Sequence, residues 1–111
     1  STQQFEKSDS IRERVIKARN IQEERYKASE GVYANAQMSS KQLKEICVIS
    51  TAGQNLLKVA MEKLNLSARA YDRILKVSRT IADLAASEDI KPEHLAEAIQ
   101  YRSLDREGWG A

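Results

Sequence analysis

The sequence LSARAYDRILKVSRTIADL occupies residues 66–84 and contains the longest amphipathic pattern of the chain. Its apolar residues recur at three- and four-residue spacing, which is the spacing of one face of an α-helix. They are Ala70, Ile74, Val77, Ile81 and Leu84. Ser67 precedes the pattern and can cap a helix N-terminus through its hydroxyl. The pattern predicts a helix over residues 68–86, which we place at the centre of the fold.

Four more helices are predicted around this one. Serine followed three residues later by Glu or Gln is a capping pattern, and it occurs at Ser10 and at Ser39. Pro92 suits the first position of a last helix, where no amide donor is needed. The remaining boundaries follow from apolar periodicity and breaker residues, giving helices over 10–27, 39–47 and 54–64, a loop over 28–38 and breaks at 50–53 and 87–89.

The first helix is expected to bury one apolar stripe, formed by Ile11, Val15, Ala18 and Ile21. Val32 and Tyr33 in the following loop are candidates to pack back on the core. No strand is predicted. The fold class is therefore all-α, a small bundle of four to five helices, with residues 1–111 as a single domain.

Composition agrees with a globular helical domain. The 111 residues are 41% hydrophobic and 31% charged, with a formal net charge of +2. This charge is too small to imply a polyanionic partner by itself. No apolar run approaches the roughly 20 residues that span a bilayer, and the N-terminus has no signal-peptide pattern, so we expect no membrane partner and a cytoplasmic location.

The residues that usually carry catalysis are sparse. The chain lacks a Gly-x-x-x-x-Gly-Lys-Ser/Thr phosphate loop, and its single cysteine, Cys47, lies among apolar residues and is expected to be a buried, inert thiol. The single histidine, His94, has no second histidine four residues away and is expected to be an ordinary surface residue. No metal site is predicted, and this chain alone is not expected to be an enzyme.

Acidic residues offer no better candidate. Asp72, Asp83 and Asp89 each lie near basic residues at helical spacing, which indicates solvated ion pairs. A basic group of Arg79, Arg102 and Arg106 beside Tyr101 matches no motif that reads nucleic acid.

Arg69, Arg73 and Lys76 form the most informative group of cations. They fall at positions i, i+4 and i+7 and so share one face of the central helix near its N-terminus. The helix macrodipole already disfavours cations at this end, which suggests a nearby anion such as phosphate. The alternative is an exposed basic face paired with Asp72 and neighbouring acids.

Residues 66–84 closely resemble the C-terminal region of magnesium-chelatase-like AAA+ ATPases of the ComM/YifB group. The resemblance continues through residues 90–102 and 104–106 and includes residues 11–15 with Ala18 and Arg19, so it covers nearly the whole chain. In AAA+ proteins this region is the helical lid over nucleotide bound to a P-loop domain. The resemblance therefore implies that this chain is a C-terminal fragment of a longer AAA+ protein whose P-loop domain precedes Ser1.

The resemblance also implies a site and partners. The family's second sensor arginine matches Arg69, with Arg73 and Lys76 as supporting basic residues, acting on its own or a neighbouring subunit's nucleotide. The parent would use ATP and Mg²⁺, with no cofactor held by this fragment alone. Its partners would be the upstream P-loop domain, neighbouring subunits of a ring, and DNA through the parent.

The chelatase motor subunit powers magnesium insertion into protoporphyrin, whereas the ComM/YifB group resembles DNA-remodelling motors. The Ser-Ala-Arg-Ala-Tyr form at residues 67–71 is similar to the ComM branch, which is linked to branch migration in natural transformation. Two alternatives remain open. One is a stand-alone helical DNA-binding module, and the other is a structural interaction domain in which Arg69 is replaceable.

Overall fold

The computed structural model describes residues 8–108, with side chains through Tyr101. Within this range it contains five α-helices and one short 3-10 helix, η2. The bounds are α1 Ser8–Tyr26, η2 Asn35–Gln37, α2 Ser40–Ile46, α3 Thr51–Leu64, α4 Ala68–Leu84 and α5 Pro92–Gly108. The described residues form no strand, only an isolated parallel bridge between Ile49 and Ile90. The predicted all-α class is confirmed.

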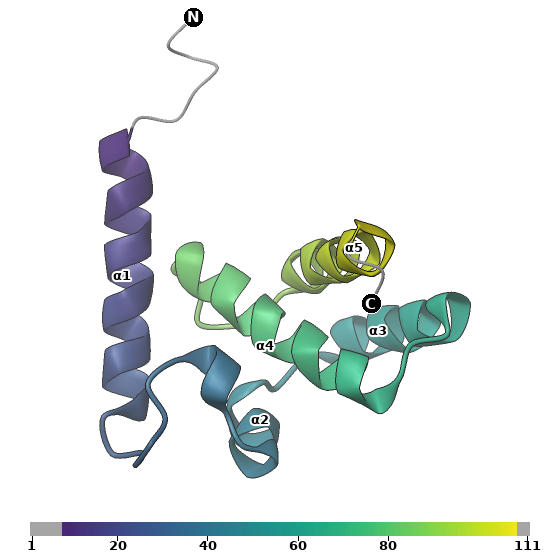
Figure 1. The fold of residues 1–111 in the computed structure, drawn as a ribbon, viewed down its shortest axis with the longest axis horizontal. Helices are drawn as coiled ribbons and strands as arrows, with labels where there is room; N and C mark the ends of the chain where they lie inside the picture. The colour runs from purple at the N-terminus through teal and green to yellow at the C-terminus, as the bar shows by residue number, and fades with distance from the viewer. Residues whose placement is uncertain (1–7, 109–111) are drawn as a thin grey trace, which may run out of the picture.

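Helix α4 is the centre of the domain, as its sequence predicts. It packs against α1, η2, α2 and α5, while α3 packs against α5. Figure 1 shows α1 standing at one side of α4 and α5 with α3 on the other side. The core between them is formed by a cluster of buried side chains that includes Met38, Leu43, Leu57, Ile74, Leu75, Ala82, Ile90, Leu95 and Ala98. No described helix is long and apolar enough to cross a membrane.

Serine hydroxyls begin three of the helices. Ser39, Ser50 and Ser67 each accept a hydrogen bond at 3.2 Å from the amide three residues further on. At Ser39 the capping box is complete, because Gln42 Oε1 accepts in return from the Ser39 amide. These contacts confirm the predicted caps at Ser39 and Ser67. Helix α3 begins at Thr51, so the break predicted over residues 50–53 is wrong: Ser50 is the cap of that helix.

The capping pair predicted at Ser10 is also wrong. Ser10 lies inside α1, which is helical from Ser8, the first described residue. Its hydroxyl is therefore not placed before the first turn, where a cap must lie. At the other end of the chain Pro92 is the first residue of α5, as predicted.

Two helices end in left-handed turns. Asn65 has a φ of 51° and Ala86 a φ of 54°. After α3 the Leu66 amide donates to the Met61 carbonyl, and after α4 the Ser87 amide donates to the Ala82 carbonyl. Each is the long-range bond of a Schellman turn. Asparagine often adopts a positive φ, so Asn65 is a signal for the turn after α3, whereas Ala86 is no signal for the turn after α4.

The apolar stripe predicted on α1 is only half covered. Ala18 is buried and Ile21 half-buried, but Ile11 and Val15 are 43% and 42% exposed. In the loop after α1, Val32 packs against the core as proposed, whereas Tyr33 is 73% exposed and does not. Ile11 and Val15 are exposed because the N-terminal half of α1 stands clear of the other helices (Figure 1).

Replacing Ala86 with glycine should stabilise the domain by about 1 kcal/mol, because glycine adopts a positive φ without the steric cost that a Cβ imposes. The matched control is Ala85→Gly, since Ala85 is the preceding residue and has a φ of −88°. There glycine only increases the entropy of the unfolded chain and should destabilise. Urea unfolding of both variants checks the opposite signs, and equal effects would contradict the role of the turn.

Candidate functional site

Asp83 is the centre of a buried charge network between α1 and α4. Its side chain is fully buried, and each of its two oxygens accepts from one guanidinium nitrogen of Arg25 at 2.8 Å. Arg79, one turn earlier on α4, donates from Nε at 3.1 Å and pairs through Nη2 at 3.0 Å. One carboxylate therefore faces two guanidinium groups, and its pair with Arg25 has the bidentate geometry that strengthens such contacts, whereas Arg79 contacts Oδ1 alone.

Asn35 joins the 3-10 helix to the same network. Its amide donates to Asp83 Oδ2 at 2.8 Å and to Thr80 Oγ1 at 3.0 Å. Its carbonyl oxygen accepts from Tyr26 Oη at 2.7 Å and from Arg25 at 2.9 Å. The loop after α1 is thus held to α4 by side-chain hydrogen bonds that are mostly removed from water.

Arg79 extends the network to the turn between α4 and α5. Its two terminal nitrogens donate to the Ser87 carbonyl at 2.6 Å and to the Glu88 carbonyl at 2.8 Å. The left-handed turn at Ala86 directs the chain so that these carbonyls face the guanidinium. On α1, the hydrogen bond that Arg25 donates to Asp83 raises the pKa of Arg25 above its ordinary value. The charged form of Arg25 is therefore stabilised, and each of the three guanidinium nitrogens of Arg79 has an acceptor inside the domain.

The network corrects two predictions. Asp83 was expected in a solvated ion pair and Arg79 in an exposed basic group, but both are buried. The i, i+4 spacing of Arg79 and Asp83 was the readable signal, whereas the contribution of Arg25 and Asn35 depends on tertiary contacts. Each oxygen of Asp83 accepts from two donors inside the domain, so the carboxylate has a structural role. The side chains of Arg102 and Arg106 lie outside the part of the chain whose side chains the structure describes.

The predicted basic face on α4 is only partly an open surface. Arg69 is exposed at the second position of the helix, and within residues 8–101 its side chain makes no hydrogen bond or ion pair. Arg73 is exposed but has an interaction partner of its own. Lys76 is half-buried and its Nζ donates to the Ala36 carbonyl at 3.4 Å. Arg69 is thus the member of the group best placed to meet an external anion.

The lone cysteine and histidine are both structural. Cys47 is buried, its thiol donates to the Leu75 carbonyl at 3.8 Å, and burial raises its pKa to about 11, which confirms the predicted inert thiol. His94 is buried as well, so its prediction as a surface residue is wrong. Its Nδ1 accepts from the Lys91 amide at 2.9 Å, capping the start of α5. Among the described residues no group of three or more His, Cys, Asp or Glu could hold a metal.

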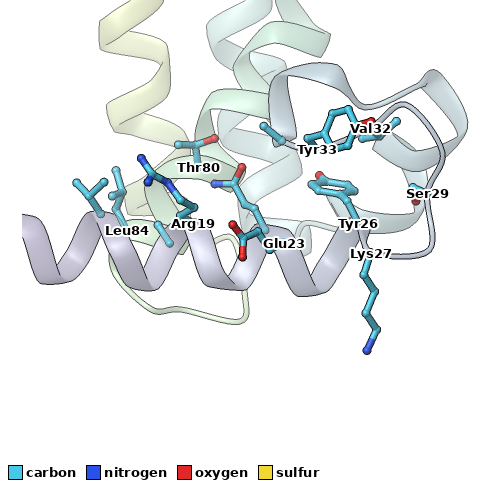
Figure 2. Close-up of a pocket in the computed structure, with 13 residues that line it drawn as sticks. Arg19, Glu23, Tyr26, Lys27, Ser29, Val32, Tyr33, Thr80 and Leu84 are labelled. Atoms are coloured by element: carbon cyan, nitrogen blue, oxygen red, sulfur yellow. The ribbon is translucent and has the colours of Figure 1, made fainter.

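A pocket of about 580 Å³ lies between α1, the following loop and α4. Figure 2 shows Tyr26, Arg19 and Glu23 lining it from α1, Leu84 and Thr80 from α4, and Val32 and Tyr33 from the loop. Lys27 points away from the pocket (Figure 2). This pocket has no signal in the sequence, because its walls come from three separate segments.

These observations define a helical domain with an exposed arginine at the start of its central helix and a buried charge network that ties this helix to α1. The profile of the family described as magnesium chelatase, subunit ChlI C-terminal, matches residues 5–102. The chain belongs to this family, which confirms the resemblance to the C-terminal domains of magnesium-chelatase-like AAA+ ATPases.

Individual relatives agree. The chain is 46% identical over 101 residues to the competence protein ComM of Haemophilus influenzae and 37% identical over 101 residues to the protein YifB of Escherichia coli, and each alignment covers 91% of the chain. An uncharacterized protein of Mycobacterium tuberculosis is 31% identical over 97 residues, covering 87% of the chain. In each case the chain spans only 19% of the relative's length.

Replacing Asp83 with asparagine should lower the free energy of unfolding by about 3–5 kcal/mol. The substitution keeps the shape but leaves Arg79 buried without a counter-charge, which is the costly way to break a buried ion pair. Asp72→Asn, also on α4 but only half-buried, should change the free energy by less than about 1 kcal/mol. Urea unfolding measures both, and similar small changes would show that the network is not a main support of the fold.

The Cys47 thiol predicts a specific pH dependence. Its pKa is about 11 in the folded state against an ordinary value of 9.0, so between pH 9 and pH 11 the unfolded chain releases a proton that the folded chain keeps. Stability is therefore lost as pH rises through this range, by up to about 3 kcal/mol from this group. Urea unfolding of Cys47→Ala should show a shallower loss than the unmodified chain, and parallel pH profiles would contradict the assignment.

Proposed function

We propose that this domain is the helical lid of an AAA+ ATPase and that Arg69 contacts a phosphate of the bound nucleotide. The nucleotide and Mg²⁺ would be held mainly by a P-loop domain that precedes the lid in the same polypeptide. Membership of the magnesium chelatase C-terminal family and the much greater length of the relatives support this proposal. The observation that carries it is the exposed position of Arg69 in the first turn of α4.

The start of α4 is suited to an anion. Ser67 caps the Ala70 amide, and helical bonding begins with the Tyr71 amide on the Ser67 carbonyl at 3.0 Å. The first amides of a helix have no carbonyl of a preceding turn to bond, and the macrodipole adds partial positive charge at the same end. A guanidinium at this position can donate two parallel hydrogen bonds to a phosphate and stabilise charge that develops during hydrolysis.

The same geometry couples nucleotide state to movement. Arg69 lies at one end of α4, and the network around Asp83 ties the other end to α1 and to the loop after it. When hydrolysis removes the terminal phosphate, the contact made by Arg69 is lost. The lid then changes its position as a unit relative to the P-loop domain and to neighbouring subunits of a ring.

We assign the parent motor to DNA processing rather than to porphyrin chemistry. The support is the name of one relative, a competence protein that is 46% identical to this chain. Remodelling of DNA branches during uptake fits the ComM-like form of residues 67–71. The location would be the cytoplasm, where nucleotide and DNA are available.

ATP binding and hydrolysis by the full-length parent test the role of Arg69. Arg69→Ala should reduce turnover by about ten- to a thousandfold, because a donor to developing charge is lost. Arg69→Lys, which keeps the charge but not the two-pronged geometry, should fall in between. The control is Lys41→Ala, an exposed cation on α2 that should leave turnover nearly unchanged.

Unchanged turnover and nucleotide affinity in Arg69→Ala would remove Arg69 from the nucleotide site and favour a structural interaction domain. Equal losses in Arg69→Ala and Lys41→Ala would indicate a general effect of charge instead of a specific contact. Adding branched duplex DNA to the same assay tests the DNA role, for which we expect a higher turnover than with protein alone.

A further inference from the structure

The apolar stripe of α1 that the domain leaves open lines two adjoining pockets, which together we call the groove. The pocket shown in Figure 2 and a second pocket of about 580 Å³ both have Val15 and Leu84 in their lining. On α1 the groove follows residues that recur at three- and four-residue spacing, namely Ile11, Val15, Ala18, Gln22 and Tyr26. From Ile11 to Tyr26 this helix face extends about 22 Å at 1.5 Å per residue.

The facing wall comes from the end of α4 and the start of α5. Ile81, Leu84 and Ala85 supply apolar surface, and Leu84 is 38% exposed. Glu93 and Glu97 of α5 line the same end of the groove. The groove is thus an apolar floor with Glu93 and Glu97 on its α5 side and residues of both signs, Arg14, Arg19 and Glu23, on its α1 side.

This shape fits an amphipathic helix. A groove about 22 Å long accommodates roughly four turns, and the two walls present apolar side chains at the spacing that meets positions i, i+3, i+4 and i+7 of a docked helix. Basic residues on the flank toward α5 would complement Glu93 and Glu97. Branched aliphatic side chains exposed by more than 40% on a helix face are better matched by apolar protein than by nucleic acid.

The position of the groove indicates where such a helix comes from. The family is a C-terminal domain, and the relatives extend over about five times the length of this chain. Any upstream segment enters the domain through the start of α1, which is the end of α1 that carries Ile11 and Val15. A helix of that segment is therefore tethered beside the groove at a high effective concentration.

We infer that this groove is the docking site of an amphipathic helix belonging to the ATPase body of the same polypeptide. This inference rests on the proposed function because it requires an ATPase body in the same polypeptide. It does not depend on the role of Arg69. Arg69 and Leu84 lie at opposite ends of α4, about 22 Å apart along the helix. The lid would thus have a permanent contact at the α1 end and a nucleotide-dependent contact at the Arg69 end.

Thiol protection tests the docking site. Val15→Cys places a thiol in the groove, and Val59→Cys places one on α3 at a residue outside the groove with similar exposure, 42% and 48% respectively. Each is labelled with N-ethylmaleimide, without nucleotide, in this chain and in the full-length parent, and the reaction of each cysteine is followed by peptide mass spectrometry. The buried Cys47 serves as an internal reference for an intact core.

We expect the Val15→Cys thiol to react at least about tenfold more slowly in the parent than in this chain, with Val59→Cys changed by less than about threefold. Equal reaction of Val15→Cys in both proteins would overturn the proposal. Equal protection of both positions would also overturn it, because the contact would not be confined to the groove. Protection of Val15→Cys in this chain that grows with its concentration would assign the groove to a second copy instead.

The outcome is separable from the test of Arg69. Labelling without nucleotide reports only on the α1 end of the lid. Protection at Val15→Cys together with normal turnover of Arg69→Ala would support the docking site and reject the sensor role. The reverse pair of results would keep the sensor role and reject the docking site.

Discussion

The Asp83 carboxylate is the interaction on which the arrangement of this domain depends. It lies fully buried between Arg25 of α1 and Arg79 of α4, and Asn35 completes its hydrogen bonds. A buried carboxylate is tolerated only when opposite charge and donors surround it, so α1, the loop and α4 must come together in one way. The apolar core includes Tyr26 of α1 as well as residues of α2–α5, and the polar network adds the contacts that orient α1 on α4.

Part of this fold could be predicted because the signals are local. The amphipathic pattern over residues 66–84 predicts the central helix α4. Ser67 marks the start of α4, Ser39 the start of α2 and Pro92 the start of α5. Such features depend on residues within one turn of each other. The Ala86 turn carried no such signal, since alanine rarely adopts a positive φ and does so here because the carbonyls after it face Arg79.

The remaining errors share a physical cause. Asp83, Arg79 and His94 are polar, so a reading by composition places them at the surface, but partners distant in the sequence or in the next turn satisfy them in the interior. Ile11 and Val15 show the opposite error, because they are apolar but exposed in this domain. An apolar stripe predicts that a helix face is buried, but it does not say which element covers that face. The role that we propose for Arg69 comes from its helix position together with the family resemblance, whereas the groove has no signal in the sequence, because its walls come from separate segments.

The pairing of Arg25 with Asp83 has a mechanical consequence. Arg25 is the next-to-last residue of α1, so the clamp holds this helix near one end, while Ser8 lies about 26 Å away along the axis at 1.5 Å per residue. A helix held in this way acts as a lever. A tilt of about 10° at the clamp would move its far end by about 4–5 Å, which is close to one helical turn. Small rearrangements at the buried carboxylate would therefore be amplified into displacements large enough to reposition whatever is joined to the start of α1.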